Sequence, residues 1–221
     1  MRTFHKAIIE VLILLLFASV CFCQQPLTNR QVEDAVTRGL SGKRHHIGLQ
    51  LIDMQVALGS AMLSGPYGMG KATGFTIHVY TPEQWVELQA MTAKDDMRPF
   101  SVNDVTDEMR APLLHVLALP SQAEYISGNG MQFAQGVKRI VLSDTNRQIT
   151  IQPEESTSGT VTTSSAMRDM SYHSGEATFP MIAVTQIRQA DSHGEFFIVV
   201  VGEKWNKFFK VKEHYLKQLG M

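Results

Sequence analysis

The feature that most constrains this fold is the position of its only two cysteines, Cys21 and Cys23, at the end of an N-terminal apolar segment. Arg2 and Lys6 precede an apolar run that begins at Val11, and polar residues follow the second cysteine at once. Basic residues before a short apolar run are typical of a secretory signal peptide. A membrane-spanning helix needs about 20 consecutive apolar residues, more than this run contains.

We therefore predict a cleavable signal peptide over residues 1–23, cut between Cys23 and Gln24. Neither cysteine follows a small residue, so we expect no lipid anchor and no transmembrane span after cleavage. The mature chain, 24–221, would be secreted or periplasmic and would contain no cysteine. Disulfides, thiolate nucleophiles and Cys-ligated zinc are excluded from such a chain, and its hydrophobic core alone must hold it together.

Charge and length limit the class of protein further. The formal net charge is −1 at pH 7, and loss of the signal segment, which carries two basic residues and one acidic residue, leaves the rest slightly more acidic. Nucleic-acid binding would require a basic excess, so we expect no nucleic-acid partner. The length suits one large domain, and we predict a single β-rich extracytoplasmic domain over 24–221 with flanking helices.

The first helix is predicted from its cap. Thr28 and Gln31 have the spacing of a capping box, in which each side chain accepts a hydrogen bond from the backbone of the other residue. Apolar residues recur behind it at helical spacing until Gly39 to Gly42. We expect a short N-terminal helix that packs on the main sheet.

Two more helices are expected. Pro82 at a first helical position predicts a helix over 82–94, with Trp85, Leu88 and either Met91 or Thr92 buried. A C-terminal helix should begin at Lys212. The segment before it, 204–212, has both an apolar helical face and a strand-like alternation, and both interpretations stay open.

Most other segments have strand patterns. They are 48–56, 75–80, 112–119, 137–142, 148–152, 179–187 and 195–202. Residues 143–147 and 190–194 are expected as hairpin connections, and the Ser/Thr-rich stretch 154–165 as a solvated edge strand or a loop. About eight strands with few crossover helices favour an α+β, β-rich fold with a largely antiparallel sheet or sandwich.

A glycine-rich segment, Gly65 to Ala72, nearly matches the phosphate-binding pattern G-x-x-x-x-G-K-[ST]. Ala72 stands where a hydroxyl would hold magnesium, and a strand is expected next, so no helix N-terminus would face a phosphate. We interpret the segment as a connection that forms a rim around a ligand.

Met167, Met170 and His173 form a soft ligand set that suits Cu(I). The chain has 12 methionines spread along its length, however, and methionine commonly fills gaps in a core. We keep a copper site as an alternative hypothesis and assign no metal ligands.

The other histidines have ordinary explanations. His45 and His46 are neighbours in a basic stretch, and adjacent strand residues point to opposite faces. His78 and His115 are expected in the middle of strands, where they meet only if those strands pair. A hydrolase would need one of them to contact a carboxylate or hydroxyl group in a pocket, and the chain has no G-x-S-x-G motif.

Acidic and basic clusters also have structural roles. Asp104, Asp107 and Glu108 are expected to cap helix starts rather than to act as acid–base pairs. The lysines between 204 and 217 alternate with aromatic residues and are expected to lie on a packed amphipathic element with their ammonium groups in water.

These observations favour an exported, non-enzymatic module that binds a ligand or protein partner through 65–73 and 154–165, because loops on a rigid sheet commonly carry function. The alternatives are a copper-binding protein and an extracytoplasmic hydrolase. We expect no cofactor.

Overall fold

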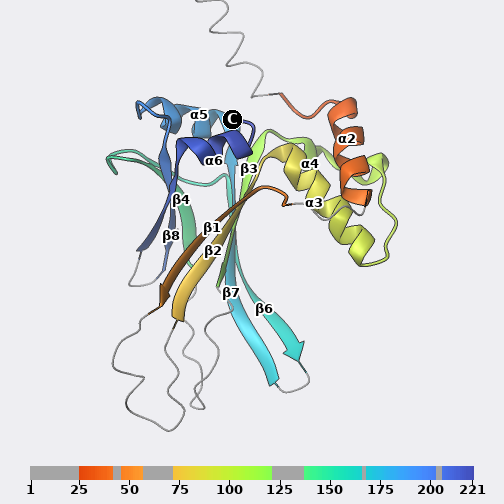
Figure 1. The fold of residues 1–221 in the computed structure, drawn as a ribbon, viewed down its shortest axis with the longest axis horizontal. Coiled ribbons are helices and arrows are strands. Elements are labelled where there is room, and N and C mark those ends of the chain that lie inside the picture. Colours follow the sequence, from red (N-terminus) through yellow and green to blue (C-terminus); the bar gives the residue numbers. More distant parts are fainter. Residues whose placement is uncertain (1–24, 42–45, 57–71, 121–136, 166–167, 203–205) are drawn as a thin grey trace, which may run out of the picture. The chain divides into compact units, whose positions relative to one another are not determined.

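The computed structural model describes residues 25–41, 46–56, 72–120, 137–165, 168–202 and 206–221. The chain forms two compact units (Figure 1). One unit is helical and combines the N-terminal part of the chain, to Arg44, with the insertion Pro82–Leu113. The other unit is built on two β-sheets and combines His45–Thr81 with Leu114–Met221.

In its described residues, the helical unit contains four helical elements. They are α2 (Asn29–Leu40), α3 (Pro82–Asp95), the 3₁₀ turn η2 (Val102–Asp104) and α4 (Asp107–Arg110). The predicted capping box of α2 is confirmed: the Thr28 amide donates to Gln31 Oε1 at 2.9 Å, and the Gln31 amide donates to Thr28 Oγ1 at 3.4 Å. The helix predicted over 82–94 is also confirmed.

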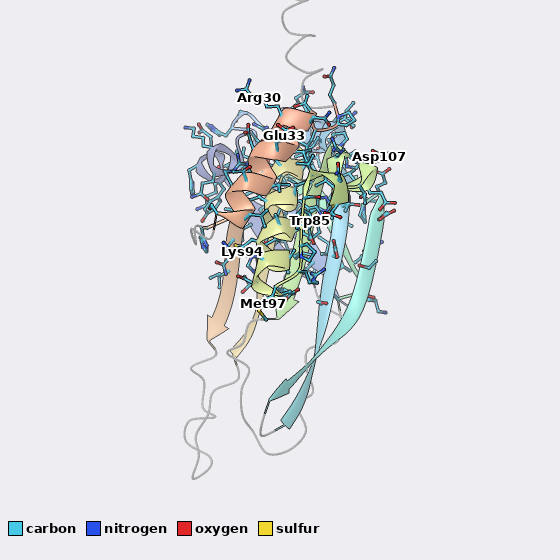
Figure 2. All side chains as sticks on the ribbon, turned by 90° about the vertical axis from the view of Figure 1, so that its right-hand side faces the viewer. Arg30, Glu33, Trp85, Lys94, Met97 and Asp107 are labelled. Carbon is cyan, nitrogen blue, oxygen red and sulfur yellow. The ribbon has the colours of Figure 1, made fainter. Side chains whose placement is uncertain are left out.

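The apolar stripe of α2 packs against α3 rather than on the sheet, as Figure 2 shows for the two neighbouring helices. Three of its buried residues, Val32, Ala35 and Val36, form a small core with Val86 of α3 and Val105. The expectation that this helix packs on the main sheet is therefore corrected. A sequence pattern shows that a helix has an apolar face but does not identify what covers it.

The predicted buried face of α3 was wrong by one position. The helix buries Val86, Glu87, Ala90 and Ala93, whereas Trp85, Leu88 and Met91 are only partly buried and Thr92 is exposed. The reason lies in the close approach of α2, because a Cβ atom added at Gly39 would lie 2.7 Å from the Ala90 Cβ. Such an approach requires small side chains at the crossing. Glu87 is tolerated there because the Arg38 Nε donates to its Oε2 at 2.9 Å.

The sheet unit contains nine strands in its described part. The five-stranded sheet has the order β1-β2-β3-β7-β6, made of β1 (Leu49–Val56), β2 (Ala72–Tyr80), β3 (Leu113–Pro120), β7 (Arg168–Pro180) and β6 (Glu155–Ser165). The four-stranded sheet has the order β5-β4-β8-β9, made of β5 (Thr150–Ile151), β4 (Arg139–Asp144), β8 (Phe196–Val201) and β9 (Asn206–Val211). Two sheets with flanking helices confirm the predicted β-rich, sandwich-like α+β fold.

One hydrophobic core is shared by the two sheets. Alternate residues of each strand enter it, as Leu114, Val116 and Ala118 do from β3 and Phe196, Ile198 and Val200 do from β8. Full burial of one such large side chain contributes about 1.5–3 kcal/mol. Apolar residues at every second position were the sequence pattern that predicted these strands. The same pattern determines which face of each strand is turned away from the core.

The segment 179–187, predicted as a strand, is a correction. The strand β7 ends at Pro180, and α5 (Met181–Gln189) follows, with Met181, Val184 and Ile187 buried on one face. Spacing by three residues is helical, although the apolar and β-branched composition suggested a strand. Residues 190–194 accordingly join a helix to β8 and do not form a hairpin.

The structure decides between the helix and strand interpretations of the segment before the C-terminal helix, in its described part. Residues 206–211 form β9, and α6 (Glu213–Gln218) begins just after Lys212, as predicted. The predicted turn after β4 is confirmed, although its second strand, β5, has only two residues. In the ranges that the structure describes, no helix is both long enough and apolar enough to cross a membrane.

Candidate functional site

The most distinctive accessible element is β6, one of the two edge strands of the five-stranded sheet. It pairs antiparallel with β7 in one continuous register, from Glu155 opposite Thr178 to Ser165 opposite Arg168, with one partner for every residue and therefore no bulge. Figure 1 shows this hairpin reaching beyond the described ends of the neighbouring strands. The stretch that the sequence left as either an edge strand or a loop is thus an edge strand.

The hairpin is anchored in the hydrophobic core through β7. Ala177 and Phe179 of β7 enter the hydrophobic core, and Gly175 lies so close to Val137 that an added Cβ would come within 2.6 Å of the valine Cγ1. On β6, by contrast, residues 155–158 are all exposed. In the sheet, β6 pairs with β7 along its whole length.

The two edges of the four-stranded sheet differ from β6 in ways that limit further pairing, whereas β1, the other edge of the five-stranded sheet, has eight residues with Asp53 as its one charge. The strand β5 has two residues, and β9 carries Lys207 and Lys210. Short length and lysine are common protections of natural sheet edges. The eleven residues of β6 contain no lysine, arginine or proline, and none after Glu155 is charged. Its outer N–H and C=O groups form a regular template for another strand.

Two carboxylates lie near the base of the hairpin. Glu155 and Glu176 occupy diagonal positions on the same face, because Glu155 is opposite Thr178 and Glu176 is opposite Thr157. Partial burial raises the pKa of Glu176, and the negative charge of Glu155 raises it further. The pair therefore makes this end of the hairpin sensitive to pH.

The structure brings the two mid-strand histidines onto neighbouring strands. In the register of β2 and β3, His78 is opposite Leu117 and Tyr80 is opposite His115, so all four residues share the sheet face turned away from the core. The His78 ring stacks on the Tyr80 ring, with 6.2 Å between centroids and 7° between planes. The strands of the two histidines do pair, but His78 and His115 lie at diagonal positions on one face, and neither is directly opposite the other.

The protonation of these groups does not favour general-base catalysis. Burial lowers the pKa of His115 to about 4. Burial also lowers the pKa of His78, and the neighbouring charge of His46 lowers it further. Burial raises the pKa of the Tyr80 phenol. An imidazole with a pKa near 4 is a weak proton acceptor at neutral pH, far from the ideal for a general base.

The acidic residues near 104–108 are capping groups, as predicted. Asp104 accepts hydrogen bonds from the backbone N–H and hydroxyl of Ser101 at 2.8 and 2.7 Å. Asp107 and Glu108 lie in the first turn of α4, where they favour the positive end of the helix. The Thr106 hydroxyl accepts from the Met109 amide at 3.3 Å.

The remaining candidates are only partly described. Residues 65–71, His45, Met167 and Lys204 lie outside the described residues, and Ala72 begins a strand, as expected for a connection that does not bind phosphate. Met170 and His173 are three positions apart on β7, and such positions belong to opposite faces of a regular strand. Within the described ranges, no three His, Cys, Asp or Glu side chains are grouped so that they could hold a metal ion.

The described C-terminal lysines lie on surface elements, as expected. Lys210 forms an ion pair with Glu195 at 2.5 Å, and Lys217 forms one with Glu213 at 3.3 Å on the exposed side of α6. Lysines on such elements can cover apolar surface with their hydrocarbon stems while their ammonium groups stay in water.

Sequence reasoning missed β7 itself. Within this strand only Met170 and His173 were singled out, as possible metal ligands, although polar residues at 174, 176 and 178 alternate with small or apolar residues at 175, 177 and 179. That alternation was the available signal for a strand. Recognition of β7 would have identified the pairing partner of the preceding Ser/Thr-rich segment, β6.

Comparison of the chain with protein-family models, with curated proteins and with solved structures found no match. The function is therefore argued from the chain's own residues and geometry.

Proposed function

We propose that this protein is an exported, non-enzymatic binding module that adds a β-strand of its partner to the free edge of β6. The observation that carries the proposal is the uninterrupted, uncharged and unbulged edge from Ser156 to Ser165 on a strand whose only described strand neighbour is β7. Strand addition draws its affinity from main-chain hydrogen bonds, and such an edge supplies them.

The anchoring of β7 in the core favours binding. Because Ala177 and Phe179 are fixed in the core, the backbone of β7 presents β6 in an extended conformation before a partner arrives. A preorganised edge loses less conformational entropy on binding than a loop that must first become ordered. The Ser and Thr hydroxyl groups of β6 can both donate and accept hydrogen bonds to side chains of an added strand.

Two further features support the proposal. The basic residues and apolar run of the N-terminal segment are typical of an exported protein. Strand addition at β6 would need no cofactor in an extracytoplasmic location. The low pKa of His115 argues against the hydrolase alternative, since its imidazole does not take up a proton readily at neutral pH.

Photo-cross-linking in the producing cells tests the proposal. A photoreactive residue replaces Ser156 or Ser158, both exposed on β6, and the matched control replaces Arg30, which is exposed on α2 (Figure 2). We expect defined covalent adducts from the two β6 positions and not from Arg30, identified by mass spectrometry. Equal adduct patterns from all three positions, or no adduct from β6, would overturn the proposal.

A further inference from the structure

We propose that the strand added to β6 is the β6 strand of a second copy of this chain, so that two five-stranded sheets join into one continuous antiparallel sheet. This inference rests on the proposed function of β6 as a strand-adding edge and names its partner. It follows from the length, charge pattern and register of the β6–β7 hairpin.

The symmetry of the strand defines the pairing. A two-fold axis that pairs the full length of both strands passes at Thr160, the middle of Glu155–Ser165. Glu155 then lies opposite Ser165 of the second copy, and Ser158 lies opposite its Thr162. A closed two-fold contact of this kind satisfies both edges at once and leaves neither β6 strand open for further growth.

The charges of the hairpin fit this arrangement. No residue from Ser156 to Ser165 is charged, so no like charges face each other along the shared ladder. At each end, Glu155 approaches Ser165 of the second copy, and the residue paired with Ser165 within its own hairpin is Arg168. Glu155 and the Arg168 position of the second copy are therefore two strands apart, roughly 10 Å, so each end of the joined edge brings opposite rather than like charges into the same region.

The edge strand β9 provides a contrast. Antiparallel self-pairing over its full length, Asn206–Val211, would place Lys207 opposite Lys210 of the second copy, and would do so twice. Like charges directly opposite each other on a sheet are destabilising. The same symmetry operation is thus unfavourable at β9 and favourable at β6.

Single-cysteine cross-linking tests the pairing and its register. In a full-length background with Cys21→Ser and Cys23→Ser, Thr160→Cys places two cysteines directly opposite each other, with Cα atoms about 4.5–5.5 Å apart, within the range of a disulfide. The matched control on the same strand is Ser156→Cys, whose two copies would be separated by eight positions, about 27 Å. Mixed chains carrying Ser156→Cys and Ser164→Cys should cross-link to each other.

Sedimentation equilibrium supplies an independent readout without cysteines. We expect the unaltered chain to dimerise and Thr160→Lys to weaken the dimer about 10-fold, because two ammonium groups then meet at the axis. Thr160→Val, which preserves the strand preference, should dimerise like the unaltered chain. Circular dichroism of both variants establishes that the fold is kept.

The inference is overturned if the chain is monomeric throughout, if Ser156→Cys cross-links to itself as readily as Thr160→Cys, or if Thr160→Lys leaves the dimer intact. Its failure is distinguishable from failure of the proposed function. If the chain is monomeric but its β6 positions still cross-link to a different protein in cells, only the self-pairing of β6 is contradicted. If no adduct forms from β6 at all, both the self-pairing and the proposed strand-adding function are contradicted.

Discussion

The crossing of α2 and α3 predicts a large effect from the smallest possible side chain at Gly39. In the structure, a Cβ atom at this position would lie 2.4 Å from the Glu87 carbonyl oxygen, 2.7 Å from the Ala90 Cβ and 3.1 Å from the Met91 nitrogen. Two of these neighbours are backbone atoms of a helix, so no side chain can turn away to relieve the contact. The two helices would have to separate by roughly 0.6 Å to bring the shortest contact to 3.0 Å.

The size of the effect follows from two opposing contributions. Overpacking of a tight site costs about 1–3 kcal/mol, whereas alanine favours a helix over glycine by about 1 kcal/mol. We expect Gly39→Ala to lower the free energy of unfolding of the helical unit by up to about 2 kcal/mol. The matched control, Thr37→Ala on the exposed side of the same helix, should instead raise it by about 0.5 kcal/mol.

Urea unfolding followed by helical circular dichroism, with amide hydrogen exchange of α2 and α3 as the local readout, distinguishes these signs. If Gly39→Ala stabilises the protein as much as Thr37→Ala does, the close crossing of the two helices is wrong.

Three further predictions concern single side chains. Met97, just after α3, is 93% exposed and has a φ of 56°, and the next amide, that of Arg98, donates to the Ala93 carbonyl at 2.7 Å. Because glycine adopts this left-handed conformation without strain, Met97→Gly should raise the free energy of unfolding by about 1 kcal/mol, measured by thermal melts. A loss of stability would contradict the left-handed cap. Burial lowers the folded-state pKa of His115 to about 4, below the unfolded-state pKa of about 6.5. The neutral imidazole therefore supports the fold above pH 6.5, and the free energy of unfolding should fall by about 3 kcal/mol as the pH drops from 6.5 toward 4. Urea titrations at several pH values should show that loss, and His115→Gln should remove it; an unchanged pH dependence in the variant would refute the assignment. The contribution of Glu176 to stability has the opposite pH dependence. Because its folded-state pKa is raised, this contribution is lost as the pH rises through that pKa. Glu176→Gln should therefore stabilise the protein by about 0.5 kcal/mol at pH 7 and by nothing measurable at pH 4, and equal effects at both pH values would count against the carboxylate pair.

Local signals in the sequence predicted the elements that depend on local interactions. The capping box at Thr28, the proline at the start of α3, the alternation in β8 and the turn after β4 all rest on contacts within a few residues, and the structure confirms each. The sandwich-like class followed because the number and spacing of strands already limit how a β-rich chain can bury its apolar faces.

Errors arose where the partner of an element is distant in the sequence. The buried face of α3 is selected by Gly39, more than 40 positions earlier, and no local pattern in α3 shows that small residues face the crossing. The segment after Pro180 has a composition typical of strands, yet the positions of Met181, Val184 and Ile187 relative to the core make it a helix. Tertiary packing overrides intrinsic preference in both cases.

The candidate site was predicted in place but not in form. The Ser/Thr-rich stretch 154–165 was expected to carry binding as a loop or an edge strand, and nothing in it reveals that β7 pairs with all eleven residues. Long-range pairing of two strands depends on where β7 is anchored, and that anchoring comes from core contacts of Ala177 and Phe179.

Residue-resolved amide hydrogen exchange over 155–165 tests the central claim, that β6 is a regular strand with a free outer edge, most directly. In dilute solution we predict that protected and unprotected amides alternate along β6, because one set donates to β7 and the other faces outward. Outward-facing amides should become protected as the protein concentration rises and two β6 strands pair. Uniformly fast exchange, or an alternation absent at every concentration, would contradict the account.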